Sequence, residues 1–122
     1  MSMKIEIHNV SGSAIAEVIS NKFIINEVQD ALDLMADCGY QGADKIILHE
    51  KNIIPDFFIL KTGIAGEILQ KFSNYRVQLA IVGDFSKYSG KSLRDFIFES
   101  NKSGRIFFVN SLEEAINKLV RQ

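Results

Sequence analysis

Short apolar segments alternate with longer segments of helical periodicity along most of this chain, and this alternation limits the folds that it can adopt. Residues 45–49 and 77–82 are apolar runs of strand length. Between them, apolar residues recur at four-residue intervals at Ile64, Ile68 and Phe72, which predicts a helix over about 62–73. Because strands joined through helices run parallel with right-handed crossovers, the sequence predicts an α/β fold around a largely parallel sheet.

The N-terminal segment predicts a β-hairpin instead. Residues 4–8 alternate between polar and apolar side chains, and residues 14–19 have the character of a second strand after the turn at 11–13. Another strand is expected at 105–109. The predicted order of elements is therefore ββαβαβαβα, a mixed sheet with helices and with residues 45–49 as its central strand.

Two pairs of polar residues have the spacing of helix capping boxes. Asn26 with Gln29 predicts the start of a helix that ends near Gly39, and Ser111 with Glu114 predicts the start of the last helix. The length of 122 residues suits one domain over residues 1–122, and 47% hydrophobic with 24% charged residues is typical of a globular chain.

Charge and hydropathy exclude several classes of partner. The net charge of -1 gives no field that would attract nucleic acid or an anionic membrane. No apolar run approaches the roughly 20 residues that span a bilayer, and residues 1–4 lead into an alternating segment rather than a signal-peptide core. We therefore expect a cytoplasmic protein.

Cys38 is the only cysteine, which rules out an internal disulfide, and it is expected to pack at a helix end.

The start of the helix near 62 carries the first candidate site, a switch or partner surface. Thr62 could accept a backbone N–H as an N-cap, worth on the order of 1 kcal/mol, or it could be phosphorylated beside Lys61 at the positive end of the helix. Gly63 and Gly66 would let a helix neighbour or a ligand approach closely. Glu67 complements the helix dipole in either case.

The loop after residue 82 carries the second candidate site. Asp84, Ser86, Lys87 and Lys91 follow the carboxyl end of a predicted parallel strand, the edge where open α/β sheets usually bind ligands. These residues could hold a small anionic ligand, or the segment could be a solvated loop. A nucleotide-binding loop is disfavoured because Phe85 stands where that motif needs a glycine.

No catalytic or metal-binding constellation is recognisable by spacing. His8 and His49 lack a partner at the close spacing of common metal motifs, so we expect no metal and no cofactor. His49 is interpreted as a hydrogen-bonded residue at a strand end, with a general base beside Glu50 or Asp56 as the alternative.

Adjacent phenylalanines provide a candidate interaction surface. Phe57 with Phe58 and Phe107 with Phe108 form two such pairs. We expect at least one ring of each pair to reach the surface, as a patch for a protein partner or for a second copy of the chain.

A hairpin followed by alternating helices and strands resembles the STAS domain, the fold of sulfate transporters and anti-sigma factor antagonists. In that family, a serine or threonine at the start of the helix after the central strand can be phosphorylated, and its charge state decides whether a partner kinase binds. Thr62, within residues 61–66, stands at the matching place. The resemblance implies a regulatory role.

Residues 56–58, 61–72 and 80–85 resemble recurring segments of a bacterial family called domain of unknown function 4180. That resemblance assigns no activity. Our hypothesis is a non-enzymatic, STAS-like regulatory or protein-interaction module that is switched at Thr62. The alternative is a sensor or enzyme for a small anionic ligand, bound by the loop from Asp84 to Ser92.

Overall fold

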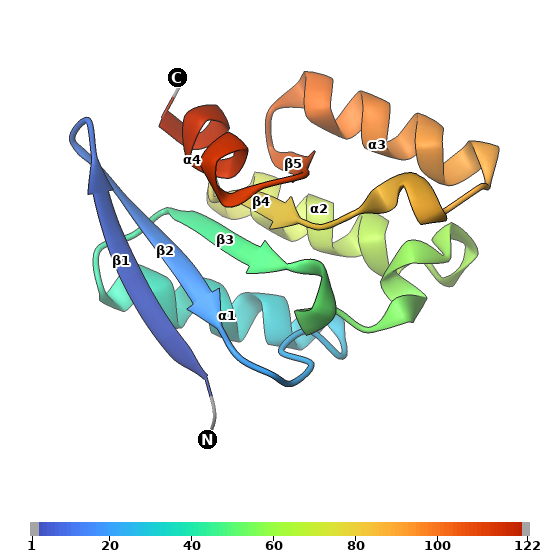
Figure 1. The fold of residues 1–122 in the computed structure, drawn as a ribbon. Coiled ribbons are helices and arrows are strands. Elements are labelled where there is room, and N and C mark those ends of the chain that lie inside the picture. Colours follow the sequence, from blue (N-terminus) through green and yellow to red (C-terminus); the bar gives the residue numbers. More distant parts are fainter. Residues whose placement is uncertain (1–2, 121–122) are drawn as a thin grey trace.

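The computed structural model describes residues 3–120, which form a five-stranded mixed sheet in the order β1-β2-β3-β4-β5 with four α-helices (Figure 1). The predicted element order is confirmed. None of the helices within residues 3–120 is both long and apolar enough to cross a membrane. The elements are β1 (Lys4–Val10), β2 (Ser13–Ile19), α1 (Val28–Tyr40), β3 (Lys45–His49), α2 (Ile64–Tyr75), β4 (Gln78–Val82), α3 (Lys91–Ser103), β5 (Ile106–Val109) and α4 (Leu112–Val120).

The N-terminal hairpin fixes the register of the sheet's first edge. Ser11 and Gly12 both have positive φ, 51° and 81°, as a tight two-residue hairpin turn requires. The turn pairs β1 antiparallel with β2 and sets Glu6 directly opposite Glu17. Strands β2 to β5 all run parallel, and β3 lies at the centre as predicted.

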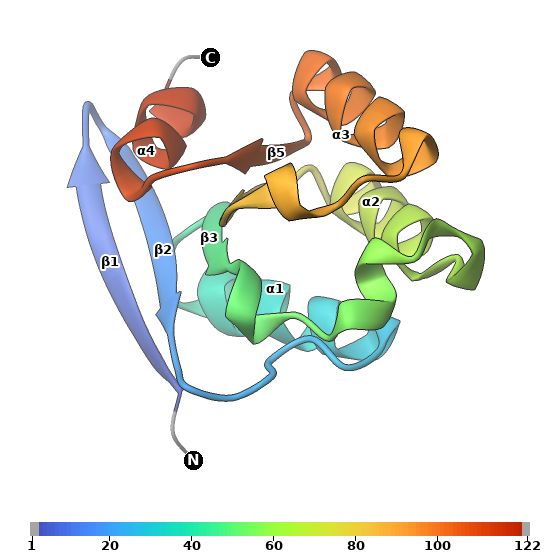
Figure 2. The same ribbon diagram turned by 45° about the vertical axis from the view of Figure 1, so that its right-hand side comes forward.

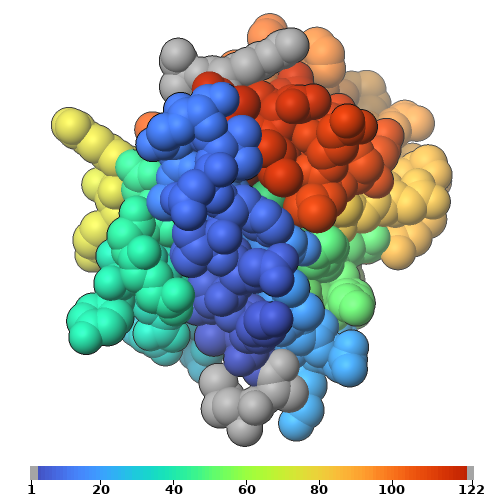
Figure 3. Space-filling view, turned by 60° about the vertical axis from the view of Figure 1, so that its left-hand side comes forward, coloured from blue at the N-terminus to red at the C-terminus, as the bar shows by residue number. Residues whose placement is uncertain are grey.

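Helices cover the two faces of the sheet unequally. Helices α1 and α2 lie on one side of the sheet and α4 on the other (Figures 1 and 2). Ala115 and Leu119 of α4 pack with Ile47, Ala80 and Phe107 from β3, β4 and β5. Figure 3 shows α4 beside the hairpin, whose strand β1 lies at the surface. On this face of the sheet, the part under α4 is apolar, and α4 does not cover the part toward the hairpin.

Side chains of α3 close the outer edge of β5. The Ser100 hydroxyl donates to the carbonyl of Ile106 at 2.6 Å. The Asn101 side chain accepts from the N–H of Phe108 at 2.8 Å and donates to its carbonyl at 3.4 Å. These bonds replace those of a further strand, so β5 is protected against pairing with another chain.

Two details of the sequence-based prediction are corrected at the helix starts. Gln29 does not cap α1; instead, the Asp30 carboxylate accepts from the N–H of Asn26 at 2.8 Å and of Glu27 at 3.1 Å. At α4 the Ser111 hydroxyl accepts from the N–H of Glu114 at 3.1 Å, as a capping box predicts. The helix expected over 62–73 begins two residues later, at Ile64.

The prediction that one ring of each adjacent phenylalanine pair reaches the surface is wrong. Phe57, Phe58, Phe107 and Phe108 are all buried, with at most 6% of each residue exposed. Both faces of β5 are covered, so its alternating side chains enter the two clusters on opposite sides of the sheet. The other pair lies in the 3₁₀ turn η2 (Pro55–Phe58), which directs both rings into the core.

Candidate functional site

Two carboxylates, each with little exposed surface, organise the polar groups near the C-terminal ends of the central strands. Glu17 lies on β2 with 8% of its side chain exposed, and Glu50 follows β3 with 13% exposed. A carboxylate in such a place needs hydrogen-bonding or charged partners, because burial disfavours its ionised form. Each of the two has such partners, and they come from different strands and loops.

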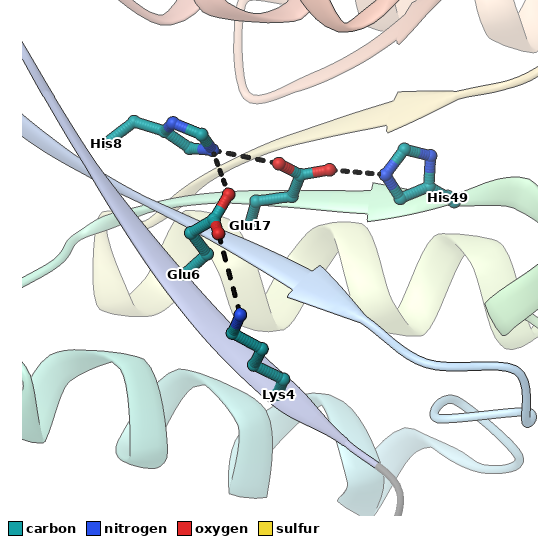
Figure 4. Close-up of polar contacts among 5 residues, drawn as sticks. All are labelled: Lys4, Glu6, His8, Glu17 and His49. Carbon is teal, nitrogen blue, oxygen red and sulfur yellow. Dashed lines mark hydrogen bonds and ion pairs between the residues drawn. The ribbon is translucent and has the colours of Figure 1, made fainter.

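Glu17 is held between two histidines (Figure 4). His8 on β1 places Nε2 2.8 Å from Oε1 of Glu17, and His49 at the end of β3 places Nε2 2.7 Å from Oε2. Glu6, on the same face of β1, lies 3.6 Å from His8 Nε2 through its Oε1. We call Glu6, His8, Glu17 and His49 the Glu–His cluster.

Sheet register explains why these residues meet. Glu6 and Glu17 are paired across β1 and β2, and His8 is two residues further along β1. Glu17 pairs with Ile47 on β3, and His49 lies two residues beyond that pair. Because side chains two apart share a face of a strand, all four project from the same side of three neighbouring strands.

The histidines control the charge of Glu17. Burial alone would raise the pKa of this carboxyl group, but the hydrogen bonds to His49 and His8 outweigh burial and lower its pKa. Glu17 is therefore ionised at neutral pH. Its cross-strand neighbour Glu6 is a second acidic group, and like charges directly opposite each other destabilise a sheet.

Glu50 anchors the loop that follows β4. Its Oε2 accepts a hydrogen bond from the Tyr88 hydroxyl at 2.7 Å and forms an ion pair with Lys87 Nζ at 2.8 Å. Burial and the bond to Glu50 raise the pKa of Tyr88. Gly83 makes room for this carboxylate, because a Cβ at that position would lie 2.6 Å from Glu50 Oε1.

A groove of about 240 Å³ opens beside Glu50. We call it the aromatic groove, because three rings and a proline form much of its lining, with two lysines among the other lining residues. Asn52 holds one side in place: its Nδ2 donates to the carbonyls of Ser20 and Lys22 at 2.9 Å each. The three rings are those of Phe23, Phe58 and Tyr88, the proline is Pro55, and the two lysines are Lys51 and Lys87.

Thr62 lies just before α2, at the end of the 3₁₀ turn η3 (Leu60–Thr62). Its hydroxyl is 2.9 Å from the carbonyl of Asp56 and 2.8 Å from that of Ile59, so its single proton can be donated to either. The same oxygen accepts from the N–H of Ile64 at 3.3 Å. Thr62 is exposed, so a modifying enzyme could reach it.

The neighbours of Thr62 differ in their roles. Lys61, Gly63 and Glu67 are exposed. Gly63 has a φ of 83°, a left-handed conformation that turns the chain into α2 and favours glycine. Gly66 does not bring any other segment close within residues 3–120, since a Cβ there would meet nothing within 4 Å.

The four residues expected to bind an anion do not converge on one point. Asp84 Oδ1 accepts from the N–H of Ser86 at 3.1 Å and from its hydroxyl at 2.6 Å, and these bonds lower the pKa of Asp84. Lys87 points to Glu50. Lys91 pairs with Asp95 at 2.6 Å, one helical turn further along α3. Asp84 and Ser86 line a separate hollow with Asn110.

Spacing along the chain did not indicate the Glu–His cluster, because its members lie on three different strands. Two signals in the sequence point to it. Ser11-Gly12 is a hairpin turn, and its register places Glu6 opposite Glu17. Glu17 is also a charged residue among the apolar residues of β2. His49 was expected to be hydrogen-bonded at a strand end, and its bond to Glu17 confirms this.

These features define a mixed α/β protein that starts with a β-hairpin and carries polar clusters where β2, β3 and β4 end. The family model named domain of unknown function (DUF4180) matches residues 10–119, and the chain belongs to this family. Comparisons with curated proteins and with solved structures gave no match.

Proposed function

We propose that this protein is a non-enzymatic, STAS-like regulatory module that binds a protein partner through the aromatic groove and is switched at Thr62. The observation that carries the proposal is the 2.9 Å contact of the Thr62 hydroxyl with the carbonyl of Asp56, one of the two carbonyls to which it can donate. Asp56 belongs to η2, and the same short turn supplies Phe58 and Pro55 to the groove. Thr62 thus contacts the same turn that supplies part of the groove's lining.

Phosphorylation would change this contact directly. A phosphorylated Thr62 has lost its hydroxyl proton, so it can no longer donate to Asp56. The phosphate brings nearly two negative charges to the N-terminus of α2, next to Lys61, where the helix dipole favours them. The modified side chain would turn toward α2 and release η2, which changes the groove at Phe58.

The groove indicates the chemistry of the partner segment. Phe23 is 50% exposed at the groove, and Phe58 stacks on Tyr88 at a centroid distance of 4.9 Å within its lining. Such a surface favours an apolar side chain. Lys51 is exposed beside these rings and would pair with an acidic residue of the partner. Lys87 also lines the groove, but it is already paired with Glu50.

Site-specific photocrosslinking in the organism that encodes the protein tests the proposal. A photoreactive phenylalanine analogue replaces Phe23 in one variant and Phe98 in a control, since Phe98 is also exposed, at 61%, but lies on α3. We expect one protein to crosslink at position 23 and not at position 98. Crosslinking should be lost in Thr62→Glu, persist in Thr62→Ser and weaken in Lys51→Glu. A crosslinked dimer would identify a second copy as the partner.

Equal crosslinking at both positions, or no effect of Thr62→Glu on a folded variant, would refute the proposal. In that case the alternative gains support, namely a small anionic ligand bound by the loop from Asp84 to Ser92. A hollow of about 640 Å³ at this loop, lined by Asp84, Ser86 and Asn110, has room for such a ligand. It requires saturable binding of inorganic phosphate that Lys91→Ala abolishes, measured by calorimetry.

A further inference from the structure

We propose that Glu6, His8 and Glu17 form a binding site for a divalent transition metal ion such as Zn²⁺, and that His49 positions Glu17 for this role. The proposal rests on the Glu–His cluster alone and is independent of the aromatic groove. Imidazole nitrogen and carboxylate oxygen are the ligands that zinc takes from histidine and glutamate.

The spacing of the donor atoms fits one metal ion. One donor atom from each of Glu6, His8 and Glu17 lies within 4.8 Å of the other two. Ligands at about 2.0 to 2.1 Å around a tetrahedral ion are about 3.3 Å from each other. His8 Nε2 is 2.8 Å from Glu17 Oε1 and 3.6 Å from Glu6 Oε1, so small side-chain rotations bring both distances to that value.

Charge balance gives the site a reason to bind a cation. Glu6 and Glu17 are acidic residues directly opposite each other on β1 and β2, and like charges in this position destabilise a sheet. Lys4 Nζ lies 3.8 Å from Glu6 Oε2, but the Lys4 side chain is 70% exposed, so solvent screens this pair and it contributes little (Figure 4). A divalent ion beside two carboxylates and one neutral imidazole forms a neutral group. The side chain of Glu17 is only 8% exposed, so neutralisation matters most there.

Binding requires a specific protonation state of His8. Without metal, the 2.8 Å contact with Glu17 is made by a proton on Nε2. With metal bound, Nε2 carries no proton and a neutral ring holds its proton on Nδ1. The metal ion thus takes the place of the proton that His8 and Glu17 share.

His49 acts as a positioning residue. It bonds to Oε2 of Glu17, the oxygen that His8 does not use, and fixes the rotation of the carboxylate. Partners of this kind behind a metal ligand typically change metal affinity 10- to 100-fold. Three protein ligands leave a fourth position of a tetrahedral ion for water or another small ligand. The side chains of His8 and Glu6 are 24% and 44% exposed, so an ion can enter from solvent.

Titration of the tag-free, chelator-treated protein with Co²⁺ tests the proposal, because the visible absorption of Co²⁺ reports four-coordinate binding. We expect one equivalent to bind and Zn²⁺ to displace it. Affinity should fall by at least ~100-fold in His8→Gln and Glu17→Gln, and by about 10- to 100-fold in His49→Gln. Glu99→Gln alters an exposed glutamate on α3 and should bind like the wild type.

Circular dichroism establishes that each variant is folded. Glu17→Gln changes a buried residue, so if it does not fold, His8→Gln and Glu6→Gln decide the question, since both side chains are partly exposed. Failure of the wild type to bind Co²⁺ at millimolar concentration would overturn the proposal. Wild-type affinity in folded His8→Gln or Glu6→Gln would overturn it as well, leaving an ion-pair network that serves only the fold.

Discussion

Replacing Gly83 by alanine tests how the end of β4 accommodates the carboxylate of Glu50, whose side chain is only 13% exposed. The added Cβ would lie 2.7 Å from the Cβ and 2.6 Å from Oε1 of Glu50, and 3.2 Å from Cζ of Phe85. The Glu50 Cβ is fixed to its backbone, so rotating the side chain cannot relieve that contact. Overpacking of this kind costs about 1 to 3 kcal/mol. If Glu50 is displaced, the hydrogen bond from Tyr88 is lost too, at about 1.5 to 3 kcal/mol.

Urea unfolding followed by circular dichroism measures the free energy of unfolding of Gly83→Ala. Gly66→Ala is the matched control, because its Cβ meets nothing within 4 Å on a helix, where alanine should stabilise by about 0.4 to 1 kcal/mol. The two identical substitutions should thus have opposite signs. Glu50→Gly should relieve the penalty of Gly83→Ala, whereas Glu50→Ala, which keeps the Cβ, should not. Unchanged stability of Gly83→Ala would refute this reasoning.

Three further predictions concern other parts of the fold. The pKa of Glu17 is lowered, so its ionised form stabilises the protein fully above the ordinary glutamate pKa of about 4.3. This stabilisation is lost as the pH falls through the lowered pKa. In urea unfolding between about pH 6 and pH 3, the free energy of unfolding should therefore fall more steeply in the wild type than in Glu17→Gln. Burial and Asp37 raise the pKa of Cys38 to about 11. The thiol of the folded protein should therefore resist a disulfide reagent at mildly alkaline pH and react only after unfolding. Fast labelling of the folded protein would contradict the burial of Cys38. Asn101→Ala removes two hydrogen bonds to the backbone of Phe108 on β5. The free energy of unfolding in urea should fall by about 1 to 3 kcal/mol, and the exposed edge of β5 should increase aggregation. A soluble variant with wild-type stability would show that the edge of β5 needs no cover.

Periodicity was sufficient to predict the element order, because the apolar pattern of each strand and helix lies within one continuous segment of the sequence. The central position of β3 followed from its continuous apolar run. Helix starts were less predictable, since Asn26 has the right chemistry but the Asp30 carboxylate makes the observed bonds. The burial of Phe57 and Phe58 depends on how η2 folds back against the core, which no local pattern encodes.

The candidate sites show the same limit in another form. Thr62 was found from its place near a helix start, and its bond to Asp56 became visible only in three dimensions. Lys87 and Lys91 suggested an anion site because they lie close in sequence. In the structure they form separate ion pairs, Lys87 with Glu50 and Lys91 with Asp95. Glu50 is distant from Lys87 in the sequence, so no local pattern indicates that pair, whereas Asp95 follows Lys91 by one helical turn.

The position of the Glu–His cluster follows from the uneven cover of the sheet. Helix α4 packs on β3, β4 and β5 with part of β2, and the adjoining part of this face carries Glu6, His8, Glu17 and His49 instead of apolar residues. Replacing a buried ionic group by well-packed apolar residues is often neutral or stabilising, so such a group is weak evidence of a stabilising role. Apolar side chains at Glu6 and Glu17 would avoid opposing two acidic groups across the hairpin. Stability alone therefore gives these four residues no clear advantage over apolar ones, and the proposed cation between Glu6 and Glu17 would supply one.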